Sequence, residues 1–417
     1  MTHEVKCWAV LFSVFAVFSV GSVLRAADAV EQKAKDVMGK ARQERIYVIG
    51  IGDSNQRFGG HGWTKYMEQA LEDKFGCWGT GLSWCSQTEE EAKRSGLPPK
   101  ELSDGAYSWW YLSGAVTGRV SWRGGQLCIA AEHPMDIRGH LKFRLVYGTF
   151  KDGDGSFHPS VRISQPPWNI IASTATPIKS CTGSFERNSC VVELPTDPSR
   201  NTPLDFSFSP PNSDIKGPFF GECLEVENTA KQSGIAYHTL YNAGGQSLYD
   251  MLKAIRDRNL TDYFQQIRIS LNGDKRCVVI INSGLNDRHE KEKSIGSTGG
   301  FDGESREAYR DNLKGLTICL EKGWLASGGR RETIHFVFMP SHPVSTPDDP
   351  SLVAYREEAV SLAKELPNAS YILLPELVPQ REMAEKKYYD QGVMSSPHLS
   401  REGYETLSKA VAKALSE

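Results

Sequence analysis

Two kinds of hydrophobic pattern divide the chain. Residues 46–51 and 277–282 are continuous apolar runs, which are typical of parallel strands buried on both faces. An amphipathic stretch over 62–75 follows the first run and predicts a helix. Similar patterns predict strands at 234–241, 334–339 and 371–374, and helices at 306–325, 352–366 and 401–415. Strands that alternate with helices in this way predict an α/β domain around a parallel sheet.

The middle of the chain has a different hydrophobic pattern. Residues 106–227 alternate apolar and polar positions in short runs that Gly and Pro interrupt. The clearest period-two runs are 141–147, 160–164, 190–194, 204–208 and 219–227. Many short strands at this spacing predict a β-sandwich or jelly roll. We therefore expect a discontinuous α/β domain over 30–100 and 233–417, with an all-β domain over 105–230 inserted into it.

Four short motifs contain candidate catalytic residues. They are Gly52-Asp53-Ser54, Gly244-Gly245, Gly284-Leu285-Asn286-Asp287 and His398-Leu399-Ser400. The first and third directly follow predicted strands, so their side chains should meet at the carboxyl edge of the sheet. Taken singly, Ser54 fits a plain turn and Asn286 a capping residue. All four motifs in one chain favour a catalytic site.

These residue types suit acyl transfer. A serine hydroxyl is a poor nucleophile until an adjacent base removes its proton. Histidine suits that task, because its unperturbed pKa is about 6.5. A glycine N–H and an asparagine amide can donate to the oxyanion of the tetrahedral intermediate, where one donor is worth roughly 10²–10³ in rate.

The order of the motifs resembles that of the SGNH (GDSL-type) hydrolases, which are serine esterases on a flavodoxin-like, three-layer α/β fold. The resemblance covers about residues 30–95 and 233–417. It implies that Ser54 is the nucleophile and His398 the general base. It also implies an oxyanion hole made of the Ser54 and Gly245 N–H groups and the Asn286 side chain, with no metal or organic cofactor.

One position departs from that family. Members usually carry Asp three residues before the His, where it orients the imidazole, but this chain has Ser395 there. Three alternatives stay open: Asp390 orients His398, a backbone carbonyl near Ser395 does so, or activity is weak or lost. The plainer interpretation of Asp390 is a turn-capping residue.

An all-β insertion after the first helix resembles the arrangement in bacterial polysaccharide O-acetylesterases, including those that act on peptidoglycan. The glycine-rich segment 75–81 resembles the exit from the first helix in that group. Trp109, Trp110, Trp122 and Trp168 stack on sugar rings or form the core of the insertion. His158 faces the crevice or is merely solvated, and the Gly-rich segment 293–304 is a lid or a plain surface loop.

The N-terminus predicts export. Residues 7–24 are apolar and follow Lys6, and Ala27-Asp28-Ala29 offers a small-residue cleavage site. We expect residues 1–29 to be a signal peptide, with an uncleaved anchor as the alternative. The mature protein would then be periplasmic or secreted, without stable insertion in a membrane.

Composition excludes some classes of protein and bears on disulfides and metal sites. The 417 residues carry a net charge of −3 with scattered Lys and Arg, which does not suit a nucleic-acid surface. Eight cysteines remain beside Cys7, and export permits disulfides. We expect Cys181–Cys190, with Cys77–Cys85 as a second pair, and free thiols at Cys277 and Cys319. Without CxxC or HxxxH spacing, a zinc site is not expected.

The sequence thus predicts an exported serine esterase that removes acetyl or other short acyl groups from a carbohydrate or polysaccharide. An O-acetyltransferase acting on a glycan is the alternative within the same chemistry. A carbohydrate-binding protein with a decayed site is the alternative from another class, which the missing Asp keeps open. A long-chain lipase is disfavoured, because no extended apolar lid segment is visible.

Overall fold

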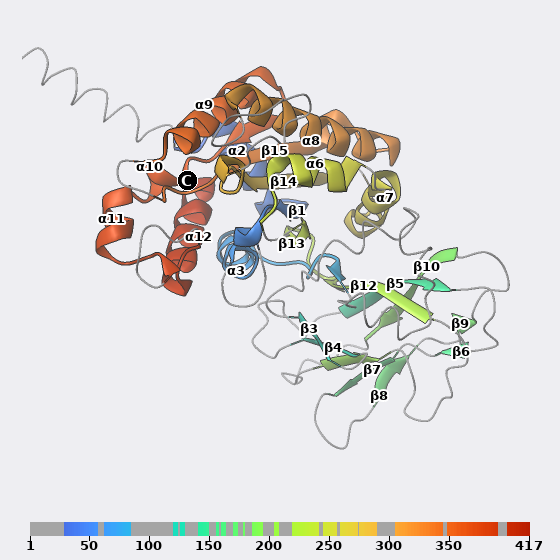
Figure 1. Ribbon diagram of the computed structural model, residues 1–417. Helices are drawn as coiled ribbons and strands as arrows, with labels where there is room; N and C mark the ends of the chain where they lie inside the picture. Colours follow the sequence, from blue (N-terminus) through green and yellow to red (C-terminus); the bar gives the residue numbers. More distant parts are fainter. Residues whose placement is uncertain are drawn as a thin grey trace, which may run out of the picture.

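The computed structural model describes the α/β region almost throughout and the middle of the chain mainly through its strands (Figure 1). The described residues are 29–56, 62–84, 120–123, 126–129, 141–149, 156–157, 160–163, 170–173, 178–179, 186–194, 204–207, 219–241, 245–256, 259–273, 275–289, 305–344, 348–390 and 398–417. The predicted signal peptide lies outside them except for Ala29. Within this part of the chain, no helix is long and apolar enough to cross a membrane.

Five parallel strands form the central sheet. They are β1 (Arg45–Ile51), β13 (Gly234–Tyr241), β14 (Arg276–Ser283), β15 (Ile334–Pro340) and β16 (Ala369–Tyr371). Their order across the sheet is β13-β1-β14-β15-β16, and each neighbouring pair is parallel. Numbered along the chain this is 2-1-3-4-5, the flavodoxin-like order. The predicted α/β fold class is confirmed.

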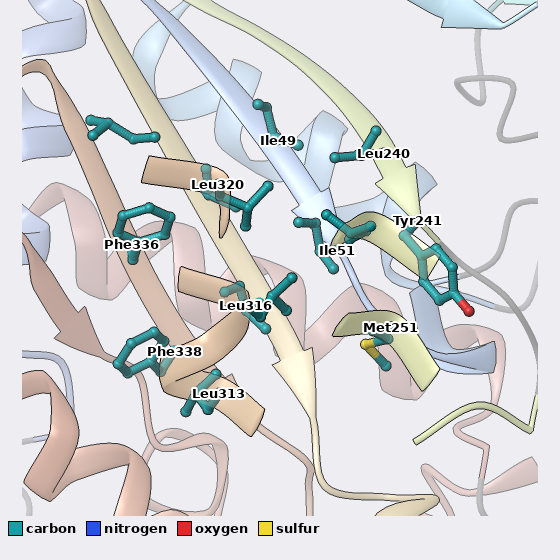
Figure 2. Close-up of a cluster of buried hydrophobic side chains, with 14 of the residues drawn as sticks. Ile49, Ile51, Leu240, Tyr241, Met251, Leu313, Leu316, Leu320, Phe336 and Phe338 are labelled. Carbon is teal, nitrogen blue, oxygen red and sulfur yellow. The ribbon is translucent and has the colours of Figure 1, made fainter. Parts of the chain in front are cut away.

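Helices cover both faces of this sheet. One core packs β1 residues such as Ile49 and Ile51 against α6 (Leu248–Arg256), α7 (Leu260–Leu271), α8 (Arg306–Ala326) and α9 (Pro350–Glu365); Figure 2 shows part of it. The other core packs Ile46 and Val48 against α2 (Gln32–Gly39), α3 (Trp63–Phe75) and α12 (Arg401–Ser416). Alternate residues of β1 thus enter opposite layers, because successive strand side chains point to opposite faces.

Shorter elements complete the α/β unit. They are α10 (Leu374–Leu377), α11 (Gln380–Glu385), and the 3₁₀ turns η1 (Lys40–Arg42), η2 (Ser54–Gln56), η3 (Asp287–His289) and η4 (Arg331–Thr333). Two of these turns, η2 and η3, directly follow the motif-bearing ends of β1 and β14, which are neighbours in the sheet.

The middle of the chain forms antiparallel sheets, as its alternating pattern predicts. One has the order β10-β5-β12-β2, from Glu186–Glu193, Leu141–Thr149, Phe219–Asn228 and Ser83–Trp84. The other has the order β3-β4-β11-β7-β8, from Val120–Arg123, Gln126–Ile129, Leu204–Ser207, Ser160–Ile163 and Ile170–Ser173. A two-stranded ribbon pairs β6 (Ser156–Phe157) with β9 (Ile178–Lys179). The β2 strand belongs to an antiparallel sheet although it precedes the boundary we expected.

A buried arginine joins the antiparallel region to the α/β unit. Arg144 of β5 donates to Glu225 of β12 at 2.8 Å, and also to the Gln266 and Ser270 side chains of α7 at 2.8 and 2.7 Å. Because the guanidinium and the carboxylate are both almost fully buried, removing either partner alone would leave an uncompensated charge.

The predicted disulfides are wrong. Cys190, Cys77 and Cys277 are free thiols, and Cys319 forms no disulfide. Cys190 lies inside β10, opposite Leu145 of β5. Burial there raises the pKa of its thiol to about 12. Cys77 donates its thiol proton to the Gly79 carbonyl at 3.4 Å.

Candidate active site

The first motif forms a tight turn at the end of β1. Gly52 leads from the strand into η2, which begins at Ser54. A Cβ at Gly52 would lie 2.9 Å from the Gln56 Cβ and 3.1 Å from the Asn282 carbonyl oxygen, closer than side-chain carbons normally approach. The turn therefore needs glycine, and it leaves Ser54 7% exposed at the carboxyl edge of the sheet.

The structure brings Ser54 and His398 together. The Ser54 Oγ and His398 Nε2 atoms are 2.8 Å apart, although the residues are 344 positions apart in the chain. This distance lies within the hydrogen-bonding range of about 2.6–3.2 Å that is typical between a nucleophile and its general base. His398 comes just before α12, whose N-cap is Ser400: the Ser400 Oγ accepts from the Gly403 N–H at 3.2 Å.

Backbone hydrogen bonds hold the His398 loop. The Asp390 N–H donates to the His398 carbonyl at 3.0 Å, and the Ser400 N–H donates to the Tyr388 carbonyl at 2.8 Å. Between them, Tyr389 forms a bridge with Leu399. Asp390 thus contacts His398 through its main chain. Ser395 lies outside the described residues. The three alternatives, namely that Asp390 orients the imidazole, that a backbone carbonyl does so, or that activity is weak or lost, therefore remain predictions.

The second and third motifs also meet. The Asn286 Nδ2 donates to the Gln246 carbonyl at 3.1 Å, next to Gly245. Gly245 is exposed with φ of +70°, a conformation that favours glycine. An amide nitrogen has two hydrogens, so one Asn286 donor remains for another acceptor. Gly244 lies outside the described residues.

Asp287 links these two loops. Its carboxylate accepts from the Leu248 N–H at 2.7 Å and from the Gly284 N–H at 2.9 Å. Leu248 begins α6, just after the Gly245 turn, whereas Gly284 opens the motif that contains Asn286. Asp287 itself is fully buried.

Asp53 precedes the candidate nucleophile in the chain and is also buried. Burial raises its pKa to about 7; hydrogen bonds with Asn55 oppose the shift and the charge of Asp287 adds to it. Its Oδ1 accepts from the Asn55 N–H at 2.8 Å, while its Oδ2 is buried without a hydrogen-bond partner among the described residues. The Asn55 side chain in turn accepts from the Tyr404 hydroxyl of α12.

Sequence reasoning missed the roles of these supporting groups. Asp53 and Asp287 lie inside two of the motifs, and adjacency to Ser54 and Asn286 is the signal that could have singled them out. Asn55 is adjacent to Ser54 too, but Tyr404 carried no such signal, because its contact with Asn55 joins residues 349 positions apart.

Other predicted residues fall outside this description. Trp109, Trp110, Trp168, His158 and the segment 293–304 are not among the described residues, and only the backbone of Trp122 is described, in β3. Among the described side chains, no group of three or more His, Cys, Asp or Glu is placed to hold a metal ion.

A cavity of about 520 Å³ lies at the opposite edge of the sheet. Its lining includes Arg276, Cys277 and Ile334, which begin β14 and β15, together with Lys40 and His335. Since Ser54 and Asn286 follow the other ends of their strands, this cavity is separate from the candidate site.

Comparison with known proteins gives similar structures but no matching family model and no matching curated protein. A solved peptidoglycan O-acetylesterase is 13% identical, with a TM-score of 0.48, over 92% of this chain and 94% of its own. A carbohydrate esterase family 2 enzyme with a carbohydrate-binding domain from Corynascus thermopiles (Myceliophthora fergusii) is 13% identical, with a TM-score of 0.28, over 71% and 94%.

A family two carbohydrate esterase from Clostridium thermocellum, solved with cellohexaose, is 11% identical, with a TM-score of 0.28, over 71% of this chain and 96% of its own. These structures include the kind of enzyme that the sequence motifs resemble.

Proposed function

We propose that this chain is an exported serine esterase, periplasmic or secreted, that removes acetyl or other short acyl groups from a carbohydrate or polysaccharide. The observation that carries the proposal is the 2.8 Å contact between Ser54 Oγ and His398 Nε2 at the carboxyl edge of the sheet. The proposed reaction is acyl transfer. A hydroxyl that a base can activate follows β1, and the Asn286 loop with its neutral amide donor follows the neighbouring strand β14.

The first half-reaction acylates the serine. Ser54 Oγ attacks the ester carbonyl carbon while His398 Nε2 takes the hydroxyl proton. The carbonyl oxygen becomes an oxyanion, for which the Ser54 N–H, the Gly245 N–H and the second Asn286 amide hydrogen are the donors. When the intermediate collapses, the bond to the sugar oxygen breaks, and the proton on His398 passes to that oxygen.

The second half-reaction frees the enzyme. A water molecule attacks the acyl-Ser54 ester, and His398 takes one proton from it. Collapse of the second tetrahedral intermediate returns this proton to Ser54 Oγ and releases the acid. The chain's own residues account for every proton moved in both halves.

The first experiment measures hydrolysis of p-nitrophenyl acetate by residues 30–417. We expect turnover by the unaltered protein and none above background by Ser54→Ala. Ser351→Ala, a partly buried serine at the start of α9, is the matched control and should retain the full rate. Turnover that survives in Ser54→Ala would refute the proposal.

Acetylated glycans then separate the alternatives. The proposed esterase releases one acetate per ester cleaved, whereas a transferase passes acetyl to a second sugar hydroxyl. Glycan binding that persists in Ser54→Ala, with no turnover by the unaltered protein, would favour a binding protein that has lost activity. Asp390→Asn tests the orienting group: a large loss of kcat supports the Asp390 side chain, and an unchanged rate excludes it.

A further inference from the structure

We infer that Asp287 is a positioning residue that holds the two oxyanion-hole loops in register. This inference rests on the proposed function, because it assigns a purpose to the loops that would bind the oxyanion. It concerns a residue that does not touch the substrate: Asp287 acts through Gly245 and Asn286.

The geometry joins segments from two different elements. One carboxylate oxygen accepts from the Leu248 N–H at 2.7 Å, and the other accepts from the Gly284 N–H at 2.9 Å. The bond to Gly284 closes the turn that carries Asn286, and the bond to Leu248 crosses 39 residues to the loop after β13. A second link runs the same way, from the Asn286 amide to the Gln246 carbonyl at 3.1 Å.

A carboxylate suits this position better than an amide. Two N–H donors converge on two acceptor oxygens, and an asparagine would turn its own NH₂ group toward one of them. A buried donor left without an acceptor is unfavourable, so the loop would move to find another partner. Asp287 is fully buried, and solvent cannot readily fill that role.

Small movements there matter for the chemistry. Oxyanion donors act when they lie about 2.7–3.1 Å from the position of the developing charge. Gly245 has left-handed backbone geometry and an exposed surface, and a Cβ placed on it would meet no atom of the described residues within 4 Å. Among the described residues, the anchors that fix where its N–H lies are therefore at Gln246 and Leu248.

A double-mutant cycle on p-nitrophenyl acetate hydrolysis tests the inference. We expect Asp287→Asn to lower kcat by about 10- to 100-fold, less than the roughly 10²–10³ lost when one oxyanion donor is removed, with KM little changed. In an Asn286→Ala background, the same substitution should cost less than about threefold, because coupled residues are not additive.

Asp250→Asn is the matched control. Asp250 of α6 also accepts from a backbone N–H of this loop, that of Ser247 at 3.2 Å, and it accepts from the Ser247 hydroxyl at 3.1 Å. Its rate should stay within about twofold of the unaltered enzyme, as expected for a partly exposed polar contact. Equal losses from Asp250→Asn and Asp287→Asn, or additive losses from Asp287→Asn and Asn286→Ala, would overturn the inference.

Hydrogen exchange on the unaltered protein tests the same anchoring without relying on a variant, which could fail to fold. The Leu248 and Gly284 amides should be as strongly protected as those of β14, and rapid exchange at either would contradict the anchoring. The two ideas fail separately: full turnover by Ser54→Ala removes the proposed function, whereas an unchanged rate in Asp287→Asn, with Ser54 still essential, removes only the positioning role.

Discussion

The two halves of the candidate site are built differently. Ser54 and His398 meet through one side-chain hydrogen bond of 2.8 Å between segments that backbone bonds hold in place. The Gly245 and Asn286 loops are instead tied by a buried carboxylate and an amide. Under the proposed function, the pair that would exchange a proton meets through one side-chain contact, whereas the two loops that would donate to an oxyanion are fixed to each other by buried side chains.

Removing a reacting group should have the largest effect. We expect Ser54→Ala and His398→Ala each to lower kcat by a factor on the order of 10⁴ to 10⁶, because nucleophile and base act as a unit. The double variant should be no worse than either single one, as measured by p-nitrophenyl acetate hydrolysis. A clearly worse double variant would mean that the two residues do not share one step.

Substitutions in the Gly245 and Asn286 loops should lower the rate less. Asn286→Ala removes one proposed oxyanion donor and the bond to Gln246, so kcat should fall by roughly 10²–10³. The measurement is steady-state kinetics on an acetyl ester. Asn368→Ala, which removes a part-buried amide at the other edge of the sheet, should leave kcat unchanged and serves as the control.

The carboxyl group beside the nucleophile should respond to pH. The pKa of Asp53 is raised from 3.8 to about 7 in the folded protein, so the folded state holds this proton more tightly than the unfolded state does. The contribution of Asp53 is therefore most favourable below about pH 4. It is lost progressively as the pH rises to about 7, and it is unfavourable above that value.

Asp53→Asn removes this titration. At pH 8 the variant should gain about 1–4 kcal/mol of unfolding free energy over the unaltered protein, from the 1.36 kcal/mol per pKa unit, and at pH 4 the two should nearly coincide. Urea denaturation at both pH values measures the difference. A gain that is equal at both would show that Asp53 does not titrate in this range.

The link between the nucleophile turn and α12 should have the smallest effect. Tyr404→Phe deletes the hydroxyl that donates to the Asn55 side chain, so stability should fall by about 1–2 kcal/mol. We expect kcat to fall by less than the loss in Asn286→Ala. A kcat loss as large as that of Asn286→Ala would mean that this link positions the donors as well.

Local patterns predicted the elements that pack most simply. The apolar runs at 46–51 and 277–282 became β1 and β14, and the periodic stretches became α3, α8, α9 and α12. In contrast, α6 and α7 were not assigned, and β10 begins four residues before the predicted strand 190–194. A short helix is stabilised mainly by the face it buries, which a local pattern shows poorly.

The sequence by itself determined the alternation of strands and helices, the antiparallel character of the middle region, and the motif residues Ser54, Asn286 and His398. These follow from periodicity and residue chemistry, which are local properties. Only the tertiary structure decided that Ser54 and His398 lie 2.8 Å apart, that Asp287 joins two loops, and that Asp53 is buried. Such contacts depend on strand order and on burial, which bring together residues whose separation in the chain carries no signal of their proximity.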